Sequence, residues 1–353
     1  MNYPQLEYEA LTNTVTGVKI REGSHPLTAK FSPTKINVEG DVAKWDEALP
    51  RRDLDTEFET RSGMATNTNT GTVRPKSSQM AITFKKREIQ PELIRMLRNP
   101  GSEAKASAEQ RLGLMLGDMT RRYVHERWEF LLAGCLQDNL SFTVEGVSHS
   151  PDFGLDASHD LTAAASWATP STDIDADVEA IKRLIAEDSG RAVREALCGR
   201  DIFGNFRRND QIKEWYQARE GAPADLRAMQ HGGVNGTASG ESVFLFGLVW
   251  TQYNNGYVPV GGSWTPYIPD DKVIFIPEVS SEWIQMQEGS VMYPSKPMAG
   301  GHGEMLSAFN ESFGVAAWSR FLDEPPSAWA YLRWAGLPVL VDPSAIVNLD
   351  TTP

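Results

Sequence analysis

Residues 102–138 read SEAKASAEQRLGLMLGDMTRRYVHERWEFLLAGCLQD, and this stretch decides the fold. Pro100-Gly101 ends the segment before it, Ser102 is a candidate N-cap, and no proline interrupts the chain from there to Asp138. Apolar residues recur at spacings of three and four, first on one face and then on a shifted one: Leu112, Met115, Leu116, Met119 and Tyr123, followed by Val124, Trp128, Leu131, Leu132 and Cys135. A helix of roughly 36 residues would span about 54 Å. Such a length is unusual in a globular enzyme and typical of a structural strut.

The composition is that of a folded protein without membrane spans. The chain has 353 residues, of which 41% are hydrophobic and 23% charged, so it can bury a substantial core. It contains no run of about 18 apolar residues, and we expect no transmembrane helix and no membrane partner. The segment from Met1 to Glu7 lacks the basic and apolar regions of a signal peptide, which predicts a protein made in a cytoplasm.

Charge and cysteine content narrow the function. The formal net charge of −13 argues against a protein that grips nucleic acid tightly, because phosphate neutralisation needs clustered Lys and Arg. It suits a protein that stays soluble at high concentration before it assembles. Cys135 and Cys198 are the two cysteines, and without metal-ligand spacing we expect two buried structural thiols.

The first 35 residues show neither helical nor strand periodicity that persists. They nevertheless contain many large apolar residues: Leu6, Tyr8, Leu11, Val15, Val18, Ile20, Leu27 and Phe31. That content is too high for a linker. We therefore predict an arm that packs on something else.

Residues 36–90 have the pattern of a long two-stranded projection. Ile36-Asn37-Val38 opens it, and the alternating run from Met80 to Phe84 closes it as a half-buried strand. Residues 62–72 form a polar, turn-prone tip. Because isolated two-stranded ribbons are marginal in water, we expect this one to lie across a neighbouring subunit.

Helices and strands then come in blocks. An amphipathic helix is expected over residues 174–189, with Asp173, Asp175 and Asp177 complementing the dipole of its first turns. A short helix is expected near residues 202–208 and a Gly-rich loop at 231–236. Strands are expected at 243–250, 273–276, 328–334, 339–341 and 346–349. Such blocks, without regular alternation, predict an α+β fold.

Several patterns approach known catalytic or ligand-binding motifs without completing them. His125-Glu126-Arg127-Trp128-Glu129 has Glu129 where a zinc-protease helix needs its second histidine, so we interpret it as a surface charge cluster. Asp173-Ile174-Asp175-Ala176-Asp177 begins like a calcium loop, but Val178 replaces the required glycine and Leu184 the required glutamate. Helix N-terminal acids are the better interpretation.

Two loops remain as weaker candidates. Gly232-Gly233-Val234-Asn235-Gly236-Thr237 lacks the continuation of a phosphate-binding loop, and we expect a flexible loop. A loop with metal-ligand residue types is expected to be solvated because their spacing is irregular: His149, Asp152, Asp156, His159 and Asp160. No nucleophile–base pair can be identified. We therefore expect no catalytic residues, no metal, no cofactor and no enzymatic activity, which favours a scaffold.

Four runs, taken in order, resemble a known family. They are KKR at 85–87 before the long helix, RDIFGNF at 200–206, YNNGYV at 253–258 with IPDDKVIF at 268–275, and WAYLRWAGLPVLVDP at 329–343. This order is similar to that of the lambda-type major capsid proteins, the phage major capsid protein E family. Residues 145–170 and 221–240 have no counterpart in that pattern and would be local insertions.

The resemblance implies the Hong Kong 97-type capsid fold. Residues 1–35 would be an N-terminal arm and 36–90 an extended β-hairpin loop. A peripheral domain would comprise 91–190 and 316–353, with the spine helix at about 102–138, and an axial domain would comprise 191–315. The lysine–asparagine crosslinking triplet of some such capsids has no match that can be placed in this sequence.

The implied function is that of a major capsid protein of a tailed, double-stranded DNA bacteriophage. Pentamers and hexamers would build an icosahedral head, which places the chain in the virion after assembly in the host cytoplasm. Implied partners are a scaffolding protein, since no helical pro-segment precedes the arm, a portal, a decoration protein, and packaged DNA contacted weakly and without sequence specificity. Two alternatives stay open: an encapsulin-like nanocompartment shell, and an unrelated hydrolase using the acidic loop at 149–160.

Overall fold

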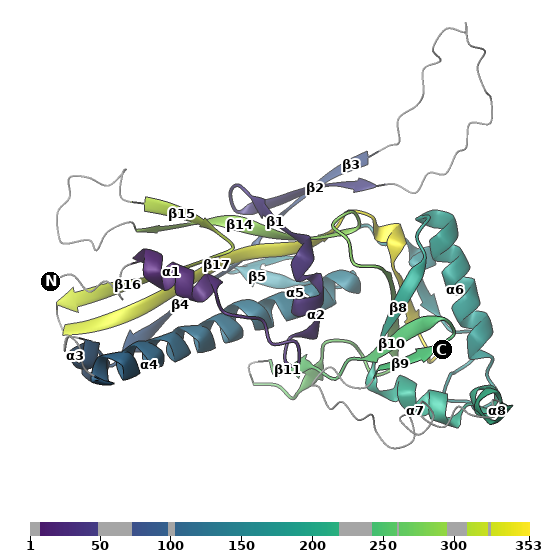
Figure 1. Ribbon diagram of the computed structural model, residues 1–353. Helices are drawn as coiled ribbons and strands as arrows, with labels where there is room; N and C mark the ends of the chain where they lie inside the picture. The colour runs from purple at the N-terminus through teal and green to yellow at the C-terminus, as the bar shows by residue number, and fades with distance from the viewer. Residues whose placement is uncertain are drawn as a thin grey trace, which may run out of the picture.

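The computed structural model describes residues 8–48, 73–97, 103–218, 242–259, 261–294, 309–323 and 326–353 (Figure 1). The helices are α1 (Tyr8–Thr16), α2 (Pro26–Phe31), α3 (Pro91–Leu97), α4 (Glu103–Thr120), α5 (Glu126–Leu136), α6 (Ile174–Asp188), α7 (Arg200–Arg208) and α8 (Asp210–Ala218). The strands are β1 (Lys35–Val38), β2 (Val42–Ala48), β3 (Val73–Gln79), β4 (Ala81–Ile89), β5 (Phe142–Val144), β6 (Val147–His149), β7 (Asp160–Thr162), β8 (Val193–Cys198), β9 (Ser242–Leu245), β10 (Leu248–Gln252), β11 (Gly256–Tyr257), β12 (Thr265–Pro266), β13 (Lys272–Pro277), β14 (Ile284–Pro294), β15 (Phe309–Phe313), β16 (Val315–Asp323), β17 (Pro326–Leu340) and β18 (Val347–Asp350).

The long helix predicted over 102–138 is confirmed, with one feature that the sequence pattern did not reveal. A π-helical turn, Arg121–His125, joins α4 to α5 without a break. A π turn holds more residues than an α turn, so it rotates the rest of the helix about its axis. The shift between the two apolar stripes therefore falls at this turn. Both stripes face the core, as the burial of Leu116 and Leu132 shows.

The first sheet is organised around β17. Its 15 residues pair with β4 along one edge and with β16 and then β14 along the other. Parallel β1 and antiparallel β15 extend the sheet from β14. We expected two separate strands at 328–334 and 339–341, and that was wrong. Gly336 and Pro338 lie in the part of β17 that pairs with β14, just after its pairing with β16 ends at Trp334.

The glycine in β17 lets the spine helix approach the sheet. The Trp128 ring packs edge-on against Trp334, with 5.2 Å between ring centroids. A Cβ atom added to Gly336 would lie 2.6 Å from Cζ2 of Trp128 and 3.0 Å from Cζ2 of Trp334. Both side chains at this contact are rigid indoles. Only glycine therefore fits here without displacing the helix from the sheet.

The second sheet has the order β7-β18-β13-β8-β10-β9. Figure 1 shows α6 and α7 beside it, away from the long helix. Its core collects side chains from these helices and the strands, among them Val178, Ile185, Phe206 and Trp250. The expected strand at 243–250 is instead the β9–β10 hairpin. Its turn uses positive φ values at Phe246 and Gly247, and an apolar turn of this kind is hard to detect in sequence.

The N-terminal segment packs against its own chain. Leu11, Val15, Leu27 and Phe31 are buried in this chain's own core. The side chain of Thr12 clips α1 to β16: its hydroxyl donates to the Ala317 carbonyl at 2.9 Å and accepts from the Ala317 amide at 3.2 Å. The expectation that these apolar groups pack elsewhere is wrong. Helices of 9 and 6 residues are too short to give a clear periodic signal.

The strands described within 36–90 do not all form one projection, as was expected. Strands β1 and β4 belong to the first sheet, and among the described residues of this segment β2 and β3 form a separate ribbon. One face of β2 is buried against the body through Ala43, Trp45 and Glu47. Figure 1 shows the ribbon diverging from the first sheet. The tip expected at 62–72 lies outside the described residues.

A pair of glycine variants tests the contact between helix and sheet. Gly336→Ala should lose about 2 kcal/mol of stability, since an extra methyl in a packed core costs roughly 1–3 kcal/mol. Gly113→Ala, in α4, has nothing within 4 Å of the new methyl and should gain roughly 0.5–1 kcal/mol. Thermal unfolding of the purified variants measures both. Equal melting temperatures for Gly336→Ala and the unmodified chain would refute the close-approach argument.

Candidate assembly surfaces

A buried carboxylate joins three distant parts of the chain. Glu129 of α5 is 1% exposed. Its Oε1 accepts from the Leu27 amide at 3.0 Å, and its Oε2 accepts from the amide and hydroxyl of Thr28 at 2.8 and 2.7 Å. The hydroxyl of Tyr253, just after β10, also donates to Oε1. Four donors therefore converge on one side chain, which we call the Glu129 clasp.

Burial dominates the electrostatics of the clasp. It raises the pKa of Glu129, and the hydrogen bonds from Tyr253, Thr28 and Leu27 act in the opposite direction. Burial and the adjacent carboxylate raise the pKa of Tyr253 well above its ordinary value, which keeps the phenol protonated as a donor. A carboxylate out of water is tolerated only with partners of this kind.

The burial of His125 and Glu129 corrects one prediction. Residues 125–129 were interpreted as a surface charge cluster, and this holds for the exposed Glu126 and Arg127. It is wrong for His125 and Glu129, which are buried. The sequence did contain a signal for this burial. His125, Glu129 and Leu132 recur at helical spacing, so the two polar residues lie on the helix face that carries Leu132.

Two histidines lie beside the clasp. His25, which precedes α2, meets His125 edge-on with 5.8 Å between ring centroids. The His125 carbonyl also accepts from the Thr28 hydroxyl at 3.3 Å. Burial, His25, Lys35 and Arg121 lower the pKa of His125 to about 4, and burial, Arg121 and Arg21 lower that of His25. Both rings are therefore neutral at pH 7, in positively charged surroundings.

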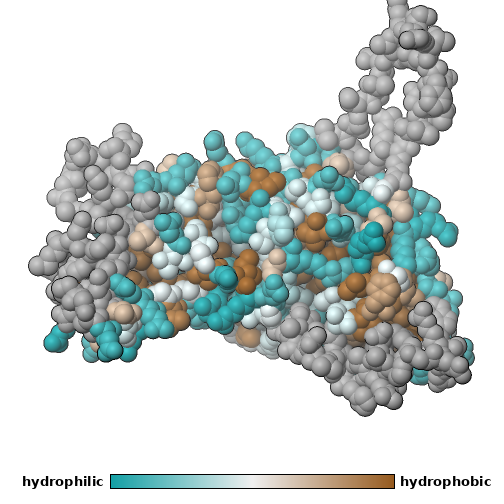
Figure 2. All heavy atoms as spheres, viewed as in Figure 1, coloured by the Kyte–Doolittle hydropathy of each residue, from teal (hydrophilic) through white to brown (hydrophobic). Residues whose placement is uncertain are grey.

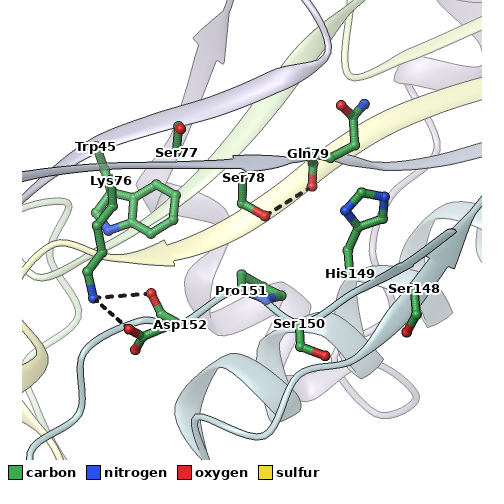
Figure 3. Close-up of a pocket in the computed structure, with 10 residues that line it drawn as sticks. All are labelled: Trp45, Lys76, Ser77, Ser78, Gln79, Ser148, His149, Ser150, Pro151 and Asp152. Atoms are coloured by element: carbon green, nitrogen blue, oxygen red, sulfur yellow. Dashed lines mark hydrogen bonds and ion pairs between the residues drawn. The ribbon is translucent and has the colours of Figure 1, made fainter.

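The base of the ribbon forms a shallow groove of about 530 Å³ (Figure 3). In the close-up, Lys76 reaches from β3 toward Asp152, and Trp45, Ser78 and His149 also line the space. Lys76 Nζ lies 3.0 Å from the buried Glu47 carboxylate and 3.6 Å from that of Asp152. The ion pair with Glu47 joins the two strands of the ribbon, and the ion pair with Asp152 links the ribbon base to the rest of the chain. The lining of this groove is mostly polar.

Large apolar side chains are exposed in several separate parts of the chain. Phe244 in β9–β10 is 69% exposed, and Val258 after β11 is 64% exposed. Figure 2 shows hydrophobic residues gathered over the β9–β10 hairpin. The other exposed apolar residues are Val42, Phe84, Leu114, Val147, Val249, Trp264, Met292 and Phe313. They are spread around the body rather than collected in one cleft.

An aromatic stack crosses three strands of the first sheet. Trp318 of β16 and Tyr331 of β17 stack with an interplanar angle of 6°, and Phe84 of β4 stacks on both at 5.6 and 5.7 Å. Phe84 is more than half exposed. Next to it, Lys86 lies over the Trp329 ring at 4.7 Å. This face is flat, apolar and bordered by cations, as protein interfaces often are.

The acidic loop at 149–160 is only partly a solvated loop. His159 is buried, with Nδ1 2.7 Å from the Ile346 carbonyl and Nε2 2.9 Å from the Asp188 carboxylate, and it serves as a core hydrogen-bonding residue. Asp152 and Asp156 are exposed. In the described part of the chain, no group of three or more His, Cys, Asp or Glu side chains is placed to hold a metal ion.

Other predicted residues have structural roles. Asp173 caps α6 by accepting from the Ala176 amide, as expected for helix N-terminal acids. Cys135 and Cys198 are free and buried, and burial raises the pKa of both thiols, which confirms the prediction of structural cysteines. The Gly-rich loop at 231–236 lies outside the described residues. None of the helices in the described ranges combines the length and apolarity needed to cross a bilayer.

The clasp makes a specific stability prediction. Glu129→Gln should destabilise the chain by about 2–3 kcal/mol, because its amide group would face donors and leave one of them unpaired. Glu126→Gln, on the exposed face of the same helix, should change stability by less than roughly 0.5 kcal/mol. Urea unfolding compares the two. Similar midpoints would show that Glu129 does not hold the N-terminal segment.

The histidine pair makes a pH prediction. Because the pKa of His125 is lowered in the folded state, stability should fall as pH decreases from about 6.5 toward 4, by on the order of 2 kcal/mol in total. Burial has the opposite effect at Glu129. It raises the pKa of this carboxyl group, so the contribution of Glu129 to stability increases as the pH decreases. Comparing His125→Phe with the unmodified chain isolates the contribution of the histidine.

The expected readout is a flatter dependence of melting temperature on pH for His125→Phe. His149→Phe is the matched control, since His149 lies outside this cluster and stacks only on Phe142. A control that flattens the profile as much as His125→Phe would contradict the assignment.

Comparison with known proteins identifies this arrangement. The family model for phage major capsid protein E matches residues 57–293. The fold is similar to that of a putative capsid protein of an E. coli CFT073 prophage, at TM-score 0.59 and 16% identity, with 98% of this chain and 99% of that chain covered. A phage-related protein from Bordetella bronchiseptica RB50 superposes at TM-score 0.55 and 14% identity, with 98% and 97% covered.

A capsid of cyanophage A-1(L) aligns at TM-score 0.51 and 9% identity over 95% of this chain and 96% of that chain. No curated protein matches the sequence. The α+β, Hong Kong 97-type fold expected from the sequence is confirmed. Since the family model covers well over half of the residues, the chain belongs to the phage major capsid protein E family.

Proposed function

We propose that this phage major capsid protein forms the pentamers and hexamers of an icosahedral, tailed-phage head. As a capsid protein of this family it is a component of the virion and assembles with copies of itself. The observation that supports pentamers and hexamers is the distribution of exposed apolar side chains. Phe84 and Met292 lie in the first sheet, Phe244 lies in the second, and Val258 follows β11 of a separate two-stranded sheet.

A closed shell needs contacts on several sides of every subunit, whereas a dimer or an enzyme needs one interface or one cleft. Large apolar groups left in water are unfavourable by about 25 cal/mol per Å². Exposed apolar side chains on several sides of a subunit are therefore all buried only when neighbouring subunits surround it. This supports a lattice rather than a single partner.

The domain layout of the family is proposed from the resemblance of the sequence to it. Residues 1–35 would be the arm, 36–90 the extended loop with β2 and β3 as its described ribbon, 91–190 with 316–353 the peripheral domain, and 191–315 the axial domain. Two strands cross between the last two regions: β14 of the axial range lies in the first sheet, and β18 of the peripheral range lies in the second. A scaffolding protein, a portal, a decoration protein and weakly held DNA are the partners proposed for the assembled head.

Expression with the cognate scaffolding protein, followed by negative-stain electron microscopy, tests the function. The unmodified chain should form closed shells. Phe244→Asp should fold normally and fail to assemble, because a charge would be buried between copies. Ser242→Asp adds the same charge to the same exposed strand and should still form shells.

Two results would contradict the proposal. One is a chain that stays monomeric with its scaffold present. The other is a Phe244→Asp variant that assembles as well as Ser242→Asp. A shell protein encoded in a genome without portal and packaging genes would instead favour a cellular compartment.

A further inference from the structure

A cationic groove lies where the N-terminal segment, the π-helical turn and the segment after β10 meet. It has a volume of about 990 Å³. Four arginines line it: Arg21 from the N-terminal segment and Arg121, Arg122 and Arg127 from the long helix. Tyr257 and Tyr267 form its other wall, stacked with 5.5 Å between centroids. We call this the arginine groove.

The arginines of the groove are not neutralised within the described part of the chain. None of the four forms an ion pair with a carboxylate of the described residues. Two carboxylates line the groove. Asp118 already pairs with Arg87 at 2.9 Å, which leaves Glu126 to face four guanidinium groups. Burial is the main cause of the lowered pKa of His25 and His125, and Arg121 contributes to both shifts.

This excess of positive charge is unusual in a chain whose formal net charge is −13. Acidic residues outnumber Lys and Arg by 47 to 34, so a cation usually finds a carboxylate nearby. Four arginines that share a groove with two carboxylates, one of them already paired with Arg87, are suited to an external anion. Guanidinium groups pair well with carboxylates in bidentate geometry, and aromatic walls that exclude water strengthen such pairs.

We propose that the arginine groove receives a carboxylate-bearing segment of a second copy of this chain during shell assembly. The inference rests on the proposed function and specifies one of its contacts. Every copy is acid-rich, so a neighbour brings the complementary charge to the groove. Complementary charges of this kind steer association and fix the register between partners.

The shape of the groove favours a protein segment over nucleic acid. Nucleic acid is held by cations that track the backbone along an extended path. Here the four arginines converge on one bounded recess with a rigid wall of Tyr257, Tyr267 and Phe130, whose rings contact one another. A recess of this form accepts a loop or turn with a few acidic side chains.

The test uses exposed arginines, so that folding is preserved. Arg122→Gln combined with Arg127→Gln should raise the protein concentration needed for shell formation about tenfold at low salt, equivalent to about 1.4 kcal/mol. The difference from the unmodified chain should shrink as salt screens the interaction. Arg95→Gln with Arg111→Gln removes the same charge from exposed positions outside the groove and should assemble normally.

A zero-length crosslink identifies the occupant. Shells of Arg122→Lys are treated with a water-soluble carbodiimide, which joins the new amine to a touching carboxylate as an amide and takes up the released water. An amide between two copies, located by mass spectrometry, supports the proposal. The untreated Arg122→Lys shells and the treated unmodified shells are the controls.

Three results overturn the inference. The first is normal assembly of the groove variant at low salt, and the second is absence of an inter-copy amide in intact Arg122→Lys shells. The third is a variant that assembles normally but loses salt-sensitive retention of duplex DNA, which would assign the groove to nucleic acid. If the unmodified chain forms no shell at all, the proposed function fails first, and this inference fails with it.

Discussion

The architecture depends on one ionisable side chain kept out of water. Glu129 accepts hydrogen bonds from the backbone amides of Leu27 and Thr28 and from the Thr28 hydroxyl, all in the N-terminal segment. It accepts another from the Tyr253 hydroxyl just after β10. A buried carboxylate without these donors would be strongly unfavourable. The requirement is therefore mutual: the acid needs the surrounding segments, and those segments are positioned by the acid. The long helix, the N-terminal segment and the approach to the second sheet are fixed relative to one another at this point.

The region around Glu129 contains both the buried clasp and the arginine groove proposed for assembly. The π-helical turn directly precedes α5 and presents Arg121 and Arg122 at the groove while directing Val124 and His125 inward. One distortion of the helix therefore separates the outward-facing arginines from the inward-facing Val124 and His125. On the first sheet, Phe84, Trp318 and Tyr331 provide a flat aromatic face instead. A subunit with chemically different surfaces can make different contacts with different neighbours, as a lattice requires.

Sequence reasoning succeeded where periodicity was long. The spacing from Leu112 to Cys135 predicted the spine helix, and even the shift of its apolar face was visible as a change of stripe. It failed where the signal was short or depended on distant residues. α1 and α2 gave too few turns for a pattern, and the hairpin turn at Phe246-Gly247 was hidden inside an apolar run. Glu129 was misplaced because its donors, Thr28 and Tyr253, lie about a hundred residues away on either side. The arginine groove could not be found for the same reason, since three separate segments build it.

The hydrogen bonds between Thr12 and Ala317 span 305 residues of sequence, and this distance orders events during synthesis. The segment that leaves the ribosome first cannot complete its contacts until strands near the end of the chain have been made. Contacts of such long range form late, because the loop they close is large. A nascent subunit therefore lacks the surface to which α1 is pinned until β16 has been synthesised, so the position of α1 is fixed late in the folding of each subunit.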